Sequence, residues 1–368
     1  MRKFPFIFLI FMLALSLTAC GEKGGDALIV AVPTPKDFAL ENTTFLEGVA
    51  LAEREIEEMN LPVKLRVQVD DDRGDFSDAV VLAQSYIDDP AVIGVVGHWF
   101  SDICLPLSSM YRQGGKLLLV PTVSVSSMTD PPSDYLFRNI SNDDQVSHVM
   151  CDYARKKGAK RAVVCYEDSD YGFSMSAELE RYAETVGMKV VDRVCAPGDF
   201  ELPDLSRKWT ALEYDTVFVV ANVEEGASFI NELSELGFAG RYVCSDGMDI
   251  DSALTVLNAN PNEVAIATTF NSESSAPGLR DFMNQFRAEF DQEPDFWGVQ
   301  GYDSVMLIAE AVRDGDVRTS EQLSAYLSAA ETIDSVYGSE HFDERHELVG
   351  RTVYMKTIAD GEFHFEGG

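Results

Sequence analysis

The chain has 368 residues, which is too long for one ordinary hydrophobic core and suits two domains of moderate size. Its 46% hydrophobic and 25% charged residues are typical of a globular protein. With 62 acidic and 29 basic residues the formal net charge is −33, which argues against nucleic acid as a partner because phosphate backbones are repelled.

The N-terminal residues have the pattern of a processing signal. Arg2 and Lys3 precede an apolar stretch, residues 4–19, that is short for a membrane-spanning helix. Small residues then stand directly before Cys20, as in bacterial lipoprotein signals. We expect residues 1–19 to be a lipoprotein signal peptide, Cys20 to carry the lipid anchor and residues 20–25 to form a tether, which places the protein outside the cytoplasm on a membrane. An ordinary secretory signal is the alternative.

The remaining cysteines are odd in number, so at most two disulfides could form among them. They are Cys104, Cys151, Cys165, Cys195 and Cys244. Cys165 and Cys195 end strand-like runs that could be neighbours, but we expect buried free thiols. The spacings match no zinc pattern.

Strand and helix patterns alternate along the first part of the chain, as in a doubly wound parallel sheet. Apolar strand patterns lie at residues 27–32, 63–70, 92–96 and 116–121. Helix patterns lie at residues 45–59, 77–87 and 101–111. Thr44 and Glu47 have the spacing of a capping box at the start of the first helix.

From about residue 143 the same alternation starts again. Strand patterns lie at residues 161–166, 188–194, 216–221, 241–245 and 264–270, with helix patterns at 146–157, 171–186, 204–212 and 225–236. Helices at 278–290, 299–313 and 320–329 and short strands at 351–355 and 362–365 complete the chain. No segment between the two parts is rich in Pro, Gly or Ser, so we expect two α/β lobes joined by strands.

Sequence patterns of common enzyme sites are missing. The chain has no GxxxxGK[ST], no GxGxxG after a strand, no HExxH and no GxSxG. His341 and His346 have no third ligand nearby, so we expect solvated side chains. His98 stands too close in sequence to Ser101 and Asp102 for a hydrolytic triad. We therefore expect no enzyme activity, no metal and no cofactor.

Polar and aromatic residues follow several predicted strands at their carboxyl ends, where open α/β sheets bind ligands. In the first part these residues are Trp99, Ser101, Thr122, Val123 and Ser124. In the second part they are Tyr171, Asn222 and Asp246. Hydroxyls beside helix N-termini suit a carboxylate and an aspartate suits an ammonium group, so the two parts together suit a zwitterion. Taken singly, residues of these types are more often helix caps or turn residues than ligand contacts, so the prediction depends on their occurring together at one end of both sheets.

Six segments in order resemble the solute-binding proteins of branched-chain amino-acid transporters, the leucine/isoleucine/valine-binding protein family. They are VDDDRGDFSDAVVLAQSYI, VIGVVGHWFSD, LLLVPTVSVSSMT, YLFRNISNDDQ, VVCYEDSDYG and RYVCSDG. The resemblance implies a type I periplasmic-binding fold, an α/β structure of two doubly wound lobes hinged around a central cleft. It implies a first lobe of residues 26–142 plus 270–345 and a second of 143–269 plus 346–368.

Site residues carried over from this resemblance lie on both lobes. Ser101 and Ser124 match the hydroxyl donors to the ligand carboxylate, and the backbone around Thr122 also contacts the ligand. Tyr171 matches a tyrosine of the second lobe. Asp246 matches the acid that holds the ligand ammonium group, where the family has glutamate.

Three positions depart from the family pattern. Trp99 replaces an aliphatic contact, Trp297 stands where a tyrosine is usual, and Asn222 stands where an aromatic residue is expected. We therefore expect a smaller, polar or aromatic α-amino acid as the ligand, with an amide, urea or aromatic acid as the alternative.

The resemblance also implies partners. The family has no catalytic activity and hands its solute to the permease of an ABC transporter. We expect a monomer that contacts a permease and is held at the membrane by its anchor. A ligand-sensing subunit for a membrane receptor is the alternative role.

Overall fold

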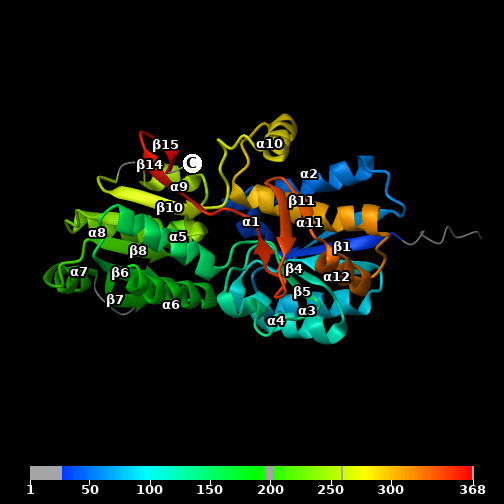
Figure 1. The fold of residues 1–368 in the computed structure, drawn as a ribbon, viewed down its shortest axis with the longest axis horizontal. Helices are drawn as coiled ribbons and strands as arrows, with labels where there is room; N and C mark the ends of the chain where they lie inside the picture. The colour runs from blue at the N-terminus through cyan, green and yellow to red at the C-terminus, as the bar shows by residue number, and fades with distance from the viewer. Residues whose placement is uncertain (1–26, 196–201, 258–259, 367–368) are drawn as a thin grey trace, which may run out of the picture.

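The computed structural model describes residues 27–195, 202–257 and 260–366. Within these ranges the chain forms two α/β lobes that lie side by side along the long axis of the molecule (Figure 1). The predicted signal peptide, the lipidation site Cys20 and the tether lie outside the described residues.

The first lobe is built on a parallel five-stranded sheet of order β2-β1-β3-β4-β5. Its strands are β1 (Leu28–Thr34), β2 (Leu65–Asp71), β3 (Val92–Val96), β4 (Leu118–Val120) and β5 (Leu136–Arg138). The connecting helices are α1 (Lys36–Asn42), α2 (Phe45–Glu58), α3 (Phe76–Asp88) and α4 (Ser101–Gly114). β1, β3 and β4 are buried throughout because helices cover both faces of the sheet, which is why these strands are continuous apolar runs.

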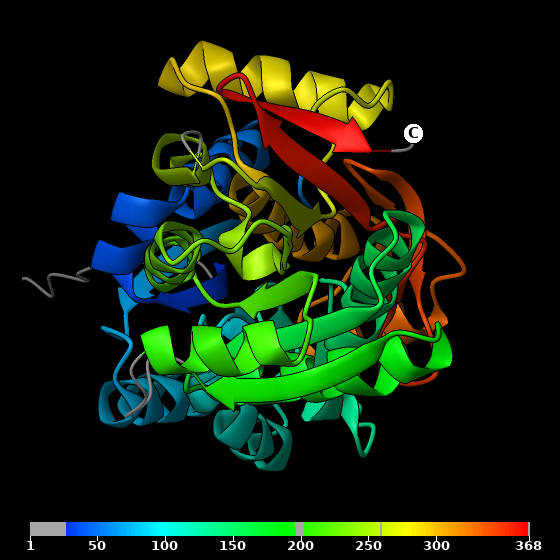
Figure 2. The same cartoon turned by 90° about the vertical axis from the view of Figure 1, so that its left-hand side faces the viewer.

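The second lobe is built on a seven-stranded sheet of order β15-β14-β10-β9-β8-β6-β7, seen from its own end of the molecule in Figure 2. Its strands are β6 (Arg161–Tyr166), β7 (Lys189–Cys195), β8 (Thr216–Val220), β9 (Arg241–Cys244), β10 (Glu263–Thr268), β14 (Tyr354–Ala359) and β15 (Glu362–Glu366). Its helices are α5 (Asp143–Lys156), α6 (Asp170–Thr185), α7 (Leu202–Ala211), α8 (Val223–Glu235) and α9 (Ser252–Leu257). The strands pair in parallel except at β14 and β15, which pair antiparallel.

Three later helices return to the first lobe: α10 (Pro277–Phe290), α11 (Phe296–Gly315) and α12 (Ser320–Ala329). α11 lies against α2 (Figure 1). The two backbones approach closely at glycines, because a Cβ atom added to Gly48 would lie 1.9 Å from the carbonyl oxygen of Gly298. A small antiparallel sheet of β11 (Ile333–Ser335), β12 (Gly338–Phe342) and β13 (Leu348–Val349) follows.

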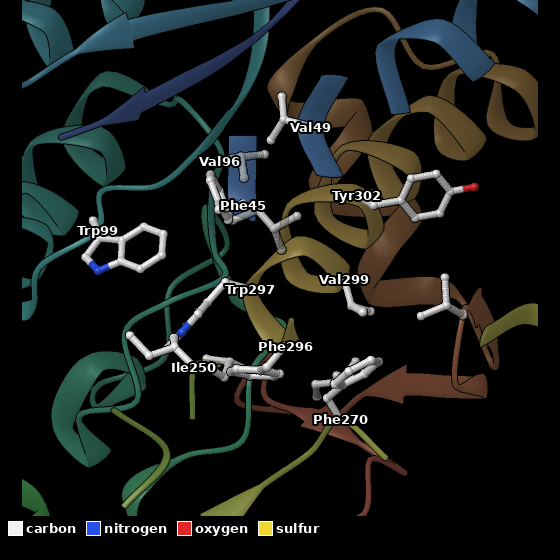
Figure 3. Close-up of a cluster of buried hydrophobic side chains, with 14 of the residues drawn as sticks. Phe45, Val49, Val96, Trp99, Ile250, Phe270, Phe296, Trp297, Val299 and Tyr302 are labelled. Carbon is white, nitrogen blue, oxygen red and sulfur yellow. The ribbon is translucent and has the colours of Figure 1, made fainter. Parts of the chain in front are cut away.

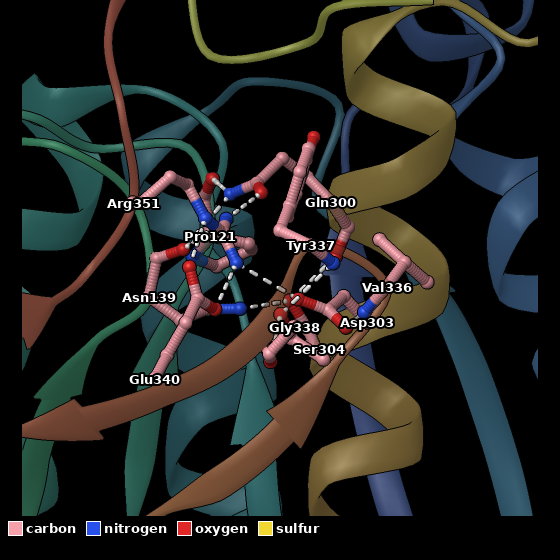
Figure 4. A network of polar contacts seen from close by, with 11 residues as sticks. Pro121, Asn139, Gln300, Asp303, Ser304, Val336, Tyr337, Gly338, Glu340 and Arg351 are labelled. Carbon is pink, nitrogen blue, oxygen red and sulfur yellow. Dashed lines mark hydrogen bonds and ion pairs between the residues drawn. The ribbon is translucent and has the colours of Figure 1, made fainter. Parts of the chain in front are cut away.

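Three segments connect the lobes, between β5 and α5, between β10 and α10, and between β13 and β14. The domain boundaries expected from the sequence stay a prediction. β13 pairs with β12, although it follows the third boundary expected at residues 345–346. The third segment is anchored by the buried guanidinium of Arg351 (Figure 4). This group lies 2.9 Å from Oδ2 of Asp303 on α11 and 2.7 Å from Oε2 of Glu340 on β12, and it donates to the carbonyl of Asn139 in the first segment.

Several local predictions differ from the structure. The capping box is wrong, because Thr44 makes no side-chain cap and instead donates to Oδ1 of Asp295 at 2.7 Å. The strand predicted at residues 351–355 begins at Tyr354. α1, β5, α9 and the small sheet were not predicted from the sequence.

The cysteines and histidines follow their predictions in part. The five described cysteines are free, as expected, but Cys195 is only half-buried. His341 is exposed as predicted. His346 is half-buried instead of solvated, because its ring stacks on Phe137 with 4.0 Å between ring centroids.

Candidate ligand site

A cavity of about 600 Å³ lies between the two lobes, and residues of both line it. Of the nine predicted site residues, eight line this cleft: Trp99, Ser101, Thr122, Ser124, Tyr171, Asn222, Asp246 and Trp297. The ninth, Val123, is not among the lining residues and is fully buried in the core of the first lobe. The structure thus brings together side chains from six separate parts of the sequence.

The first lobe presents the end of β3 to the cleft. After Gly97, whose φ of +147° is one that side chains rarely allow, the chain turns to Trp99 and then enters α4 at Ser101. Thr122 donates to the carbonyl of Trp99 at 3.0 Å and holds this turn. The N-cap residue Phe100 provides no side-chain hydrogen bond, so the positive end of α4 meets the cleft without a capping acceptor.

The second lobe presents an acid and a phenol. The phenolic oxygen of Tyr171 lies 2.7 Å from Oγ of Ser245 and 3.0 Å from Oδ1 of Asp246. Burial raises the pKa of the Asp246 carboxyl to about 7, and the neighbouring carboxyl of Asp143 adds to the rise. A cationic group in the cleft would favour the charged form of Asp246.

Asn222 has a local structural role as well as a place in the cleft. Its side chain caps α8 by accepting from the N–H of Glu225 at 3.3 Å. The backbone N–H of Asn222 donates to Oε2 of Glu167 at 2.9 Å. Glu167 lines the cleft and was missed by sequence reasoning, although it stands in the segment VVCYEDSDYG directly after β6.

Aromatic side chains form one wall of the cleft. The rings of Trp99 and Trp297 have centroids 5.1 Å apart, and Figure 3 shows Trp297 between Trp99 and Ile250. Phe38 packs edge-on against Trp99 at 5.6 Å and against Phe100 at 5.3 Å. Phe38 and Phe100 were not predicted, because a single aromatic residue in a loop or short helix carries no signal of the cavity that it faces.

His98 supports the turn before the cleft instead of serving a triad. Its ring is fully buried, with Nδ1 2.8 Å from Oδ2 of Asp72 and Nε2 2.9 Å from the hydroxyl of Tyr111. Both ring nitrogens are therefore occupied by partners other than Ser101. Asp102 does line the cleft, and it accepts from the N–H of Asp170 at 2.7 Å, which joins the first turns of α4 and α6 across the lobes.

No group of three or more His, Cys, Asp or Glu side chains in the described ranges is arranged to hold a metal ion. No helix among the described residues combines the length and the apolar character that crossing a membrane requires.

The sequence model of a family described as periplasmic binding protein matches residues 37–362 of the chain. The chain belongs to this family. This periplasmic binding protein is 23% identical in sequence to an amino acid binding protein of Pseudomonas aeruginosa, over 82% of this chain and 81% of that relative. It is also 22% identical to a Leu/Ile/Val-binding protein homolog of Brucella melitensis over 94% of both chains.

Solved structures agree with the family. An ABC transporter substrate-binding protein from Desulfitobacterium hafniense, in complex with Leu, has a TM-score of 0.83 and 29% identity, covering 92% of this chain and all of that chain. A solute binding protein from R. palustris, in complex with benzoate, has a TM-score of 0.80 and 20% identity, covering 93% and 96%. The predicted type I fold of two α/β lobes and the resemblance to the branched-chain amino-acid family are confirmed. Members of this family are solute-binding proteins and not enzymes.

Proposed function

We propose that this periplasmic binding protein captures an α-amino acid between its two lobes. The observation that carries the proposal is the distribution of polar partners across one cleft, with Ser101 and Ser124 on the first lobe and Asp246 on the second. A ligand carboxylate would meet two hydroxyls and the uncapped start of α4. A ligand ammonium group would meet Asp246, whose charged form is disfavoured without it.

The same arrangement explains why both lobes are needed. Hydrogen bonds to charged groups contribute about 1.5–3 kcal/mol each, but a carboxylate or ammonium group that loses water without a partner costs more. A ligand held by one lobe alone would leave one end unpaired. Closure of the lobes about their three connecting segments would complete both sets of contacts and exclude water.

Benzoate-type acids are a second class of ligand to consider, because the R. palustris neighbour was solved with benzoate. Such an acid offers a carboxylate and a ring that would suit Trp99 and Trp297 but no partner for Asp246. The residues that line the cleft therefore favour a dipolar ligand, and Trp99, Trp297 and Asn222 favour a polar or aromatic side chain over leucine.

A thermal-shift panel on residues 26–368 tests the proposal. The panel contains α-amino acids, benzoate and urea, and a ligand at 100 times its Kd stabilises the fold by about 2.7 kcal/mol. We expect a shift with one or more α-amino acids. A clear shift with benzoate or urea and none with any α-amino acid would contradict the proposal.

We propose further that Cys20 carries a lipid anchor after removal of residues 1–19, and that the anchored protein delivers its solute to the permease of an ABC transporter. The sequence before Cys20 and the ABC transporter descriptions of several neighbours support this role. Changing Cys20 to Ser is expected to move the protein from the membrane to the soluble fraction. Co-purification of the anchored form with a permease would favour transport, and co-purification with a receptor or kinase would favour sensing.

A further inference from the structure

The main cleft carries more negative charge than one ammonium group needs. Four carboxyl side chains line it: Asp102, Glu167, Glu224 and Asp246. None of the described residues that line it is basic. Residues 196–201 and 258–259 contain no lysine, arginine or histidine either. If Asp246 meets the α-ammonium group of a ligand, the other three acids still have no positive partner among the lining residues.

Glu167 is the acid whose position is best fixed. It stands at the carboxyl end of β6 and is half-buried. One carboxylate oxygen accepts from the hydroxyl of Ser169 at 2.8 Å. The other accepts from the backbone N–H of Asn222 at 2.9 Å and from its side-chain amide at 3.3 Å. A carboxylate has about four acceptor positions, so Glu167 keeps capacity for a donor from a ligand.

Aromatic rings of the first lobe line the same cleft as this acid. Phe38, Trp99 and Phe100 pack in an edge-on row, with Phe38 in the middle. A cation is attracted to aromatic faces and to carboxylates alike, and both attractions grow when water is excluded. A neutral alkyl side chain would instead displace water from the Glu167 carboxylate when the lobes close, without donating a hydrogen bond in its place.

We infer that the ligand is an α-amino acid with a cationic side chain, either an ammonium or a guanidinium group. This inference rests on the proposed function, because Ser101, Ser124 and Asp246 hold the two ends common to every α-amino acid. The distal cation lies between Glu167 and the aromatic row, and the exposed Glu224 adds to the field. The cavity of about 600 Å³ is large enough for a side chain of this length.

The test compares L-arginine with L-citrulline, which has nearly the same shape and no side-chain charge, by titration calorimetry at low and at physiological salt. The unaltered protein is expected to bind arginine at least about 10-fold more tightly than citrulline, because one charge-assisted contact is lost. Glu167→Gln keeps a hydrogen-bond partner for both Ser169 and Asn222. We expect this variant to bring the two affinities within about 3-fold of each other, mainly by weakening the binding of arginine.

The control is Asp168→Asn, which removes the same charge from the neighbouring exposed position outside the cleft and should keep the arginine preference. Equal or tighter binding of citrulline or leucine by the unaltered protein would overturn the inference and leave the proposed function standing. An arginine preference that survives Glu167→Gln would overturn the role of Glu167. Binding of benzoate with no α-amino acid bound would overturn both the inference and the proposed function.

Discussion

The phenolic oxygen of Tyr171 lies 3.0 Å from Oδ1 of Asp246, and this contact joins the first turn of α6 to the end of β9. Only 5% of the Asp246 surface is exposed. Burial raises the pKa of the Asp246 carboxyl to about 7. The charged carboxylate therefore lowers the stability of the protein when no ligand is bound. We therefore expect Asp246 to contribute to ligand affinity and not to the stability of the fold.

The substitution Asp246→Asn is expected to stabilise the empty protein at alkaline pH. An unfolded aspartate has a pKa of 3.8, so between about pH 4 and pH 7 the folded state keeps a proton that the unfolded state has lost. Stability therefore falls as pH rises through this window, by at most about 4 kcal/mol at about 1.4 kcal/mol per pH unit, and the asparagine variant escapes this loss. Urea denaturation of both proteins without ligand at pH 5 and pH 8 measures the difference in unfolding free energy. A gain that is equal at both pH values would contradict the assigned cause.

The substitution Ser101→Ala is expected to weaken amino-acid binding about 10- to 100-fold, because the carboxylate loses one hydrogen-bond donor worth about 1.5–3 kcal/mol. Titration calorimetry with an amino acid that binds the unaltered protein measures the change. The matched control is Ser109→Ala on the same helix, which does not line the cleft and should keep the Kd within about 2-fold. Full binding by both Ser101→Ala and Asp246→Asn would show that the site lies elsewhere.

The buried strands could be predicted from the sequence because each strand shows its burial by its own unbroken apolar run. Val92–Val96 and Arg161–Tyr166 have the bounds that the apolar runs indicate, since strands covered on both faces need an unbroken run. The capping box failed for a tertiary reason. Asp295, which is 251 positions away, accepts the hydrogen bond of Thr44 that the local pattern assigns to the helix.

The cleft could be predicted in part for the same reason. Ser101, Ser124 and Asp246 stand shortly after the carboxyl ends of β3, β4 and β9, so the topology alone brings them to one edge of each sheet. Phe38 could not be found in this way, because only the packing of α1 against Trp99 turns it toward the cavity. Glu167 could have been found in this way, because it directly follows β6.

The substitution Gly48→Ala is expected to destabilise the first lobe by about 1–3 kcal/mol or more, because the added methyl group would overlap the backbone of α11. Helix propensity alone predicts the opposite sign, since alanine stabilises a helix interior by about 1 kcal/mol relative to glycine. The sign of the change in unfolding free energy therefore separates the two causes. Ala50→Gly at an exposed position of α2 is the control and should cost only the propensity difference. Stabilisation by Gly48→Ala would contradict the close approach of the helices.

The substitution Arg351→Met is expected to destabilise the protein by about 3–5 kcal/mol, because Asp303 and Glu340 would stay buried without their cation. The side chains of these two acids are only 9% and 3% exposed, so water cannot replace the guanidinium. Urea denaturation of Arg351→Met beside Arg207→Ala measures the difference. Arg207 pairs with Asp204 at the surface with 74% of its side chain exposed, and its loss should change stability by less than about 1 kcal/mol. Adding Asp303→Asn and Glu340→Gln to Arg351→Met should recover part of the loss, because the unpaired charges are then gone. Equal effects of the two arginine substitutions would mean that the Arg351 network does not fix the third connection between the lobes.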